Sequence, residues 1–205
     1  MPDVSNSKEE KVTLGDIADV VVGQILTRVA SKTDEGETVS VMVPKAIAAG
    51  VIIKEDFGEA ILAKKVDQDK YTRAGDVVIK LSTPYDAAYV AETGAGLLLP
   101  SFCAAIRVVK ADVMDAKYLS AFLNSSYVKD QLMAKIVGST RPMIKITDLR
   151  ALEIPKIPTE DMRDIGEAYI LSGKKKAVLQ EMIETENRLM ENIVLGSIKE
   201  VKDNG

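Results

Sequence analysis

The sequence of 205 residues contains no histidine and only one cysteine. Without histidine the chain cannot build a His-dependent catalytic triad, and it lacks the commonest zinc sites and the most usual general base. Cys103 has no partner for an intramolecular disulfide. Its position in the apolar run 102–109 favours a buried structural thiol over a nucleophile, which needs a basic or helix-terminal setting.

Motifs for nucleotide and acyl-transfer chemistry are also missing. There is no P-loop, no dinucleotide fingerprint, no Gly-x-Ser-x-Gly elbow and no Asn-Pro-Pro-Tyr type of loop such as an adenine methyltransferase needs. Acidic pairs occur at Asp67 with Asp69 and at Glu160 with Asp161, but such surface pairs usually serve solvation. We therefore expect no catalytic centre, no metal site and no cofactor.

Long apolar runs are absent as well. No stretch approaches the roughly 18 residues that a membrane span needs, and the polar residues 1–11 contain no apolar core of a secretory signal. We expect a cytoplasmic protein. Residues 1–11 are predicted to form a disordered leader, because they are short, charged and without periodicity.

The formal net charge of −4 argues mildly against nucleic acid as a partner, but the charge is unevenly distributed. The N-terminal tail and the C-terminal segment are acidic. The stretch 135–156 is basic, with Lys135, Arg141, Lys145, Arg150 and Lys156 against Asp148 and Glu153. A local patch of this kind can bind phosphate even when the whole chain is acidic.

The middle of the chain is predicted to be mostly β. Strands are indicated at 20–22, 38–43, 77–81 and 102–109, with further apolar segments at 47–53, 88–91 and 97–99. Helices are predicted at 14–18, 117–123 and 127–137, the last with Ser126 as its N-cap. The fold class is therefore α+β: a mixed α/β domain with a mainly β core over 12–158, then a long coiled-coil-type helix over 159–205.

This last helix is predicted from Thr159 to about Glu200, since prolines just upstream prevent an earlier start. About 40 residues at ~1.5 Å each would give a rod on the order of 60 Å, and such a rod usually projects. Gly166 and Gly173 lie one heptad apart. They either permit the close approach of another helix or mark a kink near Gly173.

Apolar or small residues recur along the rod in steps of three and four, which indicates a heptad seam. The seam consists of Ile165, Tyr169, Ser172, Leu179, Ile183, Met190 and Ile193. A second apolar row beside it consists of Leu171, Val178, Met182 and Leu189. Because this face is wider than a two-stranded seam requires, we expect the helix to contact more than one neighbour.

A series of motifs then follows in a definite order. They are YTRAGDVVIKL (71–81), an apolar strand, YLSAFLNS (118–125), GST (138–140), IKITDL (144–149), LEIPKIP (152–158) and the long helix. Each motif alone is weak, but in this order and spacing they resemble the specificity subunit of type I restriction-modification systems. The resemblance covers nearly the whole chain beyond the leader.

This resemblance implies a target recognition domain of mixed α/β build, followed by a spacer helix. It implies a protein without catalysis of its own, which reads a split double-stranded DNA sequence. Members of the family hold modification (methyltransferase) subunits, which bring the S-adenosylmethionine site, and restriction subunits can join them. The domain carried here would read one half of the split site.

The chain departs from the family pattern in three respects. Members commonly carry two recognition domains and two spacer helices, so this chain resembles a half-length form. Pairing its helix antiparallel with a second copy would restore the two-fold arrangement, although pairing with another half-subunit, or folding of the helix onto its own domain, would also bury the apolar face. Met162 stands near the place of a Gln that often follows the Pro-rich segment, and the pI of about 5.1 suggests weak DNA binding by this chain alone.

Under the resemblance, the polar loops 24–32 and 80–85 and the segment 138–145 are candidates for one DNA-facing surface. The residues expected to supply charge are Arg28, Lys32, Lys80, Arg141 and Lys145, and those expected to supply hydrogen bonds are Gln24, Thr27, Ser82, Thr83, Tyr85, Ser139 and Thr140. Base-reading and phosphate-holding roles cannot be divided among them. Without the resemblance, the first loop is more simply a solvated connection, and 138–142 a loop that ends a helix.

Two other functions remain open. The chain could be a protein-interaction adaptor with no DNA role, in which the helical rod binds the partners. An enzyme of another kind is disfavoured by the missing histidine and the absent motifs.

Overall fold

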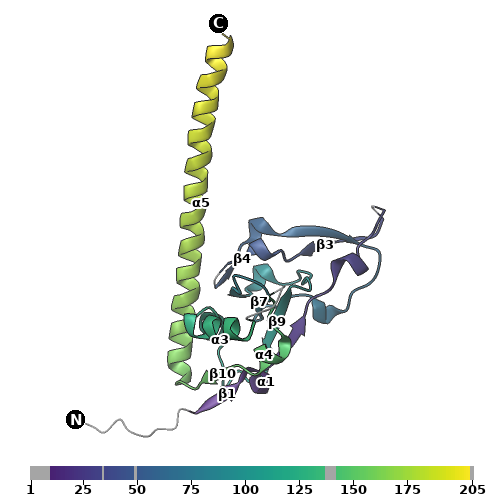
Figure 1. The fold of residues 1–205 in the computed structure, drawn as a ribbon, viewed down its shortest axis with the longest axis vertical. Coiled ribbons are helices and arrows are strands. Elements are labelled where there is room, and N and C mark those ends of the chain that lie inside the picture. Colours follow the sequence, from purple (N-terminus) through teal and green to yellow (C-terminus); the bar gives the residue numbers. More distant parts are fainter. Residues whose placement is uncertain (1–9, 34, 49, 137–141, 204–205) are drawn as a thin grey trace, which may run out of the picture.

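The computed structural model describes residues 10–33, 35–48, 50–136 and 142–203, which form a mixed α/β globule and one long projecting helix (Figure 1). The expected α+β fold, with a sheet-rich core and a long C-terminal helix, is confirmed. The candidate DNA contacts Ser139, Thr140 and Arg141 lie outside the described residues, as does most of the expected leader.

A four-stranded antiparallel sheet forms the centre of the globule. Its strand order is β2 (Ala18–Val22), β9 (Cys103–Val108), β7 (Val77–Lys80) and β8 (Ala87–Tyr89). The two central strands are the continuous apolar runs of the sequence, and they are buried almost throughout because both faces of the sheet are covered.

Three smaller strand pairs complete the β structure. β3 (Glu37–Val41) pairs with β6 (Gly58–Leu62), and β4 (Ile47–Ala48) pairs with β5 (Val51–Ile52). β1 (Lys11–Thr13) pairs with β10 (Glu153–Pro155), which joins the two ends of the globule. Lys11 therefore belongs to the fold, so the prediction that the leader extends through residue 11 is wrong at that end, because backbone pairing with β10 orders it.

Short 3-10 turns occupy several of the connections. They are η1 (Leu26–Arg28), η2 (Pro44–Ala46), η3 (Lys54–Asp56), η4 (Gln68–Lys70) and η5 (Glu92–Gly94). η1 lies between β2 and β3 and contains Thr27 and Arg28, two of the predicted DNA contacts.

One face of the sheet is covered by helices α1 (Leu14–Ile17), α2 (Ala116–Leu123), α3 (Ser126–Ile136) and α4 (Ile146–Arg150). The predicted helices are thus present. The cap of α3 is one residue earlier than expected, since the Val128 backbone N–H donates to Ser125 Oγ at 3.3 Å. α2 is capped by Asp115, whose carboxylate accepts from the Tyr118 N–H at 2.9 Å.

The opposite face of the sheet carries a second apolar cluster, which contains Cys103. The thiol is buried, and this burial raises its pKa to about 12, so it stays protonated at neutral pH. Cys103 is therefore the structural thiol that its apolar surroundings predicted.

The long helix α5 (Thr159–Asp203) is 45 residues long. Its first turns pack on α2 through a side that includes Met162, Gly166, Ile170 and Gly173, all of which are buried. A Cβ atom on Gly166 would lie 2.6 Å from the backbone nitrogen of Tyr118, so Gly166 serves the close approach of a helix. The helix continues without interruption through Gly173 (Figure 1).

Met162 is 1% exposed and belongs to the main core. This residue stands near the place of the Gln that the resemblance led us to expect. An apolar side chain at this position anchors the foot of α5 in the globule.

Candidate nucleic-acid interface

The sheet register brings two of the predicted DNA-facing loops together. β2 and β7 both run antiparallel to β9, and the last residues of both strands lie opposite the first two residues of β9. Strands two positions apart in a sheet are separated by about 10 Å. The loops that carry Gln24 and Ser82 therefore leave the same end of the sheet, on either side of β9.

The third predicted segment is tied to the loop that follows β7. The Ile144 N–H donates to the Leu81 carbonyl at 2.8 Å, and the Tyr85 hydroxyl donates to the Pro142 carbonyl at 3.3 Å. Lys145, which is exposed, thereby lies next to this loop. The loop after β7 and the segment 142–145 thus meet at the end of the sheet from which the loop after β2 also leaves.

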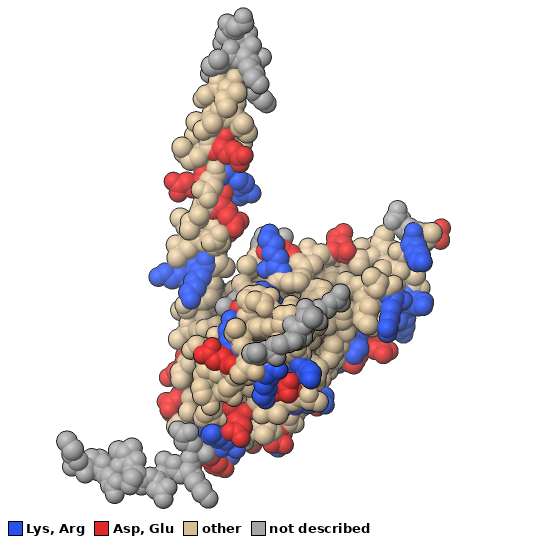
Figure 2. Space-filling view, in the orientation of Figure 1, with Lys and Arg blue, Asp and Glu red and all other residues tan. Residues whose placement is uncertain are grey.

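The loop after β2 continues through η1, where Thr27 and Arg28 are exposed, to the exposed Lys32. This segment lies against the turn that follows β6, because the Ala63 N–H donates to the Val29 carbonyl at 2.8 Å. Figure 2 shows Lys and Arg side chains at this end of the globule, away from α5.

The turn after β6 adds two exposed lysines, Lys64 and Lys65, to the same region. They are absent from the predicted site. The available signal was a pair of lysines directly after a strand. The contact that places them beside residues 28–32 is tertiary and cannot be read from the pattern.

Two of the predicted DNA contacts are not exposed. Lys80 ends a central strand, and only 11% of its side chain is exposed. Its ammonium lies 3.2 Å from Asp86 Oδ2, and the Lys129 ammonium lies 2.9 Å from Asp86 Oδ1. Two cations share one carboxylate, which leaves an excess positive charge beneath the loop.

Tyr85 is 4% exposed, and its ring belongs to the main core. Its φ angle of 59° lies in the left-handed region, which non-glycine residues rarely adopt. The buried ring and the hydroxyl bond to residue 142 hold this conformation. The prediction that Lys80 and Tyr85 face DNA directly is therefore corrected, because both side chains are buried beneath the loop. Thr83 is exposed at the surface of this loop.

Beyond the globule, α5 exposes a broad apolar stripe. At ~100° per residue, both predicted apolar rows lie roughly 130–145° around the helix from the side that packs on the globule. The stripe residues have exposed fractions between 48% and 69%; those of the first row are Leu179, Ile183, Met190 and Ile193, and those of the second row are Leu171, Val178, Met182 and Leu189. The helix therefore has one face for its own globule and a second, nearly opposite face open to another partner.

The part of the predicted seam near the start of α5 agrees less well with the structure. Ile165 and Ser172 are exposed, but Tyr169 is half-buried against its own globule, where its ring would contact a Cβ placed on Gly50 at 2.7 Å. Burial raises the pKa of the Tyr169 hydroxyl, and the Asp86 carboxylate raises it further. Tyr169 is therefore a contact within one chain, which corrects its prediction as a seam residue.

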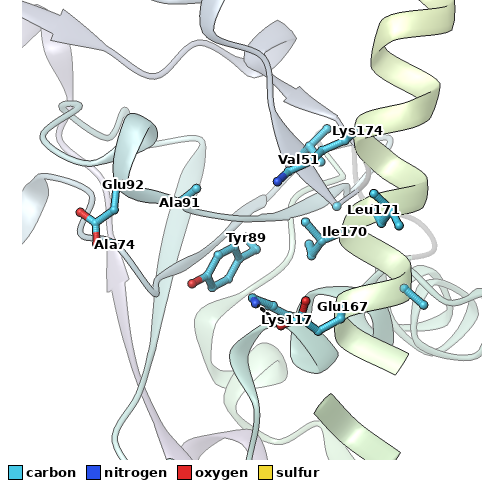
Figure 3. A pocket seen from close by; sticks show the side chains of 12 residues that line it. Val51, Ala74, Tyr89, Ala91, Glu92, Lys117, Glu167, Ile170, Leu171 and Lys174 are labelled. Atoms are coloured by element: carbon cyan, nitrogen blue, oxygen red, sulfur yellow. Dashed lines mark hydrogen bonds and ion pairs between the residues drawn. The ribbon is translucent and has the colours of Figure 1, made fainter. Parts of the chain in front are cut away.

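The foot of α5 is also held at the edge of a pocket between the helix and the globule (Figure 3). Lys117 of α2 and Glu167 of α5 point toward each other there, with Nζ and Oε1 2.6 Å apart. Lys117 also lies over the ring of Tyr89, 5.8 Å from its centroid. The hydrogen bond with Glu167 raises the pKa of Lys117, and the same bond lowers the pKa of Glu167.

Within the described ranges, no group of three or more His, Cys, Asp or Glu side chains is arranged to hold a metal ion. In the same part of the chain, no helix is both long and apolar enough to cross a membrane.

Neither the protein-family models nor the curated proteins gave a match to this chain. Several solved structures do match this chain. A chain from a structure that addresses complex assembly and conformational transition of the type I restriction-modification system has a TM-score of 0.62 and 20% identity, and the match covers 87% of this chain and 45% of that one.

Two specificity subunits give similar values. The HsdS subunit from Thermoanaerobacter tengcongensis has a TM-score of 0.59 at 21% identity, covering 88% of this chain and 44% of its own. The type I S subunit from M. genitalium has a TM-score of 0.55 at 14% identity, covering 86% and 42%. The chain thus spans less than half the length of each of these proteins. Its fold is that of type I specificity subunits, as the order of its motifs predicted.

Proposed function

We propose that the chain is a DNA sequence-specificity subunit of a type I restriction-modification system, acting in the cytoplasm and reading one half of a bipartite target. The observation that carries this proposal is the separation of two surfaces. Polar loops from three parts of the chain border one end of the sheet, whereas the exposed apolar stripe lies on the projecting helix. A protein that reads DNA and holds other subunits needs two such surfaces.

In this proposal the exposed and partly exposed residues of the sheet end contact DNA directly. Arg28, Lys32 and Lys145 hold phosphates, and Gln24, Thr27, Ser82 and Thr83 offer hydrogen bonds to phosphates or base edges. Ser139, Thr140 and Arg141 are retained as contacts on the strength of the sequence. Lys80 and Tyr85 act indirectly, since their burial lets them fix the loop above them.

The stripe on α5 is proposed to pair with the α5 of a second copy, antiparallel and about a two-fold axis. Such a homodimer carries two identical reading domains at opposite ends of the paired helices. Its target would therefore consist of two equal half-sites in inverted orientation.

The proposed dimer also holds modification subunits, and a restriction subunit can join them. Two apolar rows on α5 provide room for more than one neighbour, which supports docking beside the paired helix. The chain itself is proposed to carry out no chemical step, and methylation would belong to the modification subunit.

The exposed stripe also supports the second candidate function, an adaptor without a DNA role. The two functions differ in what the sheet end does. Replacing Gln24, Thr27, Arg28, Lys32, Ser82 and Thr83 by Gly or Ser, with the buried Val29 and Tyr85 kept, would leave every partner of an adaptor bound, but would abolish DNA binding by a specificity subunit.

A salt titration tests the proposal more finely. The chain, assembled with its modification subunit, is titrated with a randomised duplex pool at two salt concentrations. Arg28→Ala with Lys145→Ala should weaken binding and reduce the slope of log affinity against log salt by about 1 for each phosphate that the protein no longer neutralises.

Lys110→Ala is the matched control, because Lys110 is exposed just beyond the other end of β9. It should leave both the affinity and the slope unchanged. The proposal fails if the double variant binds like the wild type at both salt concentrations.

A further inference from the structure

The loop 82–85 has two stems, and they are held differently. The first stem is held by backbone contacts, including a bridge between Ser82 and Met143. The second stem, Asp86-Ala87, pairs with β7, since the Lys80 N–H donates to the Asp86 carbonyl at 2.9 Å, and it is held in addition by the side chain of Asn124 at the end of α2. Asn124 Oδ1 accepts from the Ala87 N–H at 3.0 Å, and its Nδ2 donates to the Ala87 carbonyl at 2.7 Å.

The same amide also fixes its own helix, since Nδ2 donates to the Ser120 carbonyl at 2.8 Å. The Asn124 side chain therefore connects α2 with Ala87 in the second stem of the loop. The Gly50 N–H donates to the same Ala87 carbonyl at 2.9 Å, which completes the pairing of this backbone group.

The foot of α5 meets this stem through Tyr169. Its ring packs on Gly50, whose N–H donates to the Ala87 carbonyl, and burial and the Asp86 carboxylate both raise the pKa of the Tyr169 hydroxyl. Loop, α2 and spacer helix thus converge at one point, which we call the junction (Asp86, Ala87, Asn124 and Tyr169).

We propose that Asn124 is a positioning residue for DNA reading: it sets the loop 82–85 relative to α5, and so relative to the other half of a dimer. The inference rests on the proposed function and deepens it by naming what fixes the reading loop to the spacer. A carboxylate shared by two lysines cannot do this alone, because ionic contacts tolerate changes of angle, whereas the paired amide contacts to Ala87 fix both distance and orientation.

A purely structural role for Asn124 would predict only a less stable protein. The control for this is Thr72, whose buried hydroxyl donates to the Gly94 carbonyl at 2.7 Å and accepts from the Leu97 N–H at 3.0 Å. Thr72→Ala removes a comparable side-chain clamp, but one that holds the backbone of residues 94–97, beyond β8, and not the loop 82–85.

The experiment compares Asn124→Ala, the nearly isosteric Asn124→Asp and Thr72→Ala in the full chain. Hydrogen exchange measured by mass spectrometry reports on residues 80–87. Exchange there should be about tenfold faster in Asn124→Ala and at least as fast in Asn124→Asp, whose carboxylate cannot donate to the Ala87 and Ser120 carbonyls, while that of β9 stays unchanged. Thr72→Ala should speed exchange around 94–97 instead.

The binding measurement uses the same variants assembled with the modification subunit and the randomised duplex pool. Asn124→Ala should weaken binding by about tenfold or more, and Thr72→Ala by less than about twofold, even at equal loss of thermal stability. Asn124→Asp keeps the acceptor for the Ala87 N–H but sets a carboxylate oxygen against the Ala87 and Ser120 carbonyls, so it should weaken binding at least as much as Asn124→Ala.

Three outcomes overturn the inference. Exchange of 80–87 that is unchanged in both Asn124 variants shows that Asn124 does not hold the loop. Faster exchange together with wild-type DNA affinity shows that the Asn124 contacts to Ala87 do not matter for DNA binding. If the wild-type assembly itself fails to bind duplex, the proposed function fails, and Asn124 is then a structural residue whatever its effect on exchange.

Discussion

The proposed dimer is tested by placing charge in the apolar stripe of α5. Ile183→Glu together with Met190→Glu should abolish self-association. Both side chains lie in the part of α5 that projects from the globule, and each is 54% exposed. The substitutions should therefore leave the fold of a single chain unchanged.

The size of the effect follows from burial. Fully burying an Ile or Met side chain contributes about 1.5–3 kcal/mol, so covering the exposed half of each contributes about 1 kcal/mol. A two-fold dimer contains four such side chains, so about 4 kcal/mol is lost before any cost of burying carboxylates. This corresponds to a dissociation constant about 10³-fold weaker.

Light scattering after size-exclusion chromatography measures the result directly, because the monomer mass is 22.2 kDa. The control is Gln180→Glu with Asn187→Glu, which adds the same charge at exposed positions outside the stripe. We expect the wild type and this control at twice the monomer mass, and the stripe variant at the monomer mass. A stripe variant that still forms a dimer would refute the proposed interface.

Two further predictions concern the packing of the globule. Gly166→Ala should destabilise the protein by roughly 1–3 kcal/mol in a denaturant titration, despite the better helix propensity of Ala, because a Cβ would lie 2.6 Å from the Tyr118 nitrogen. The control Lys175→Ala, at an exposed position of the same helix, should stay within about 0.5 kcal/mol of the wild type. Equal free energies of unfolding for the two variants would contradict this prediction. Cys103 should resist alkylation at pH 8 in the native state and react on unfolding, because its pKa is raised to about 12 by burial; rapid labelling of the folded chain would contradict that.

The main elements could be predicted from the sequence because their patterns are local. β7 and β9 are apolar apart from Lys80 and Arg107, and such a run is typical of a central strand covered on both faces. The rod was predictable because its apolar spacing extends over many turns. In both cases the signal lies within the element itself.

The burial of Lys80 was not predictable, because its partners come from elsewhere in the fold. Asp86 follows the loop, and Lys129 lies on α3, 43 residues after Asp86. A lysine at the end of a strand looks the same in sequence whether it points to solvent or to a buried carboxylate. The same limit explains why Lys64 and Lys65 were missed.

Tyr169 shows a different limit, which is geometric. A heptad repeat is 3.5 residues per turn, whereas a straight helix has about 3.6, so a seam drifts by ~20° per heptad. Over the three heptads from Met190 back to Tyr169 this amounts to about 60°, which turns Tyr169 toward the globule. The spacing predicted the stripe correctly but not where the globule interrupts it.

The central claim is that this chain directs a modification activity to a split DNA site. Sequencing methylated bases across the host genome, with and without the gene for this chain, tests it most directly. We expect one bipartite motif, with equal half-sites in inverted orientation, to lose its methylation when the chain is absent and to regain it on complementation. A methylation pattern that is identical with and without the chain would contradict the account.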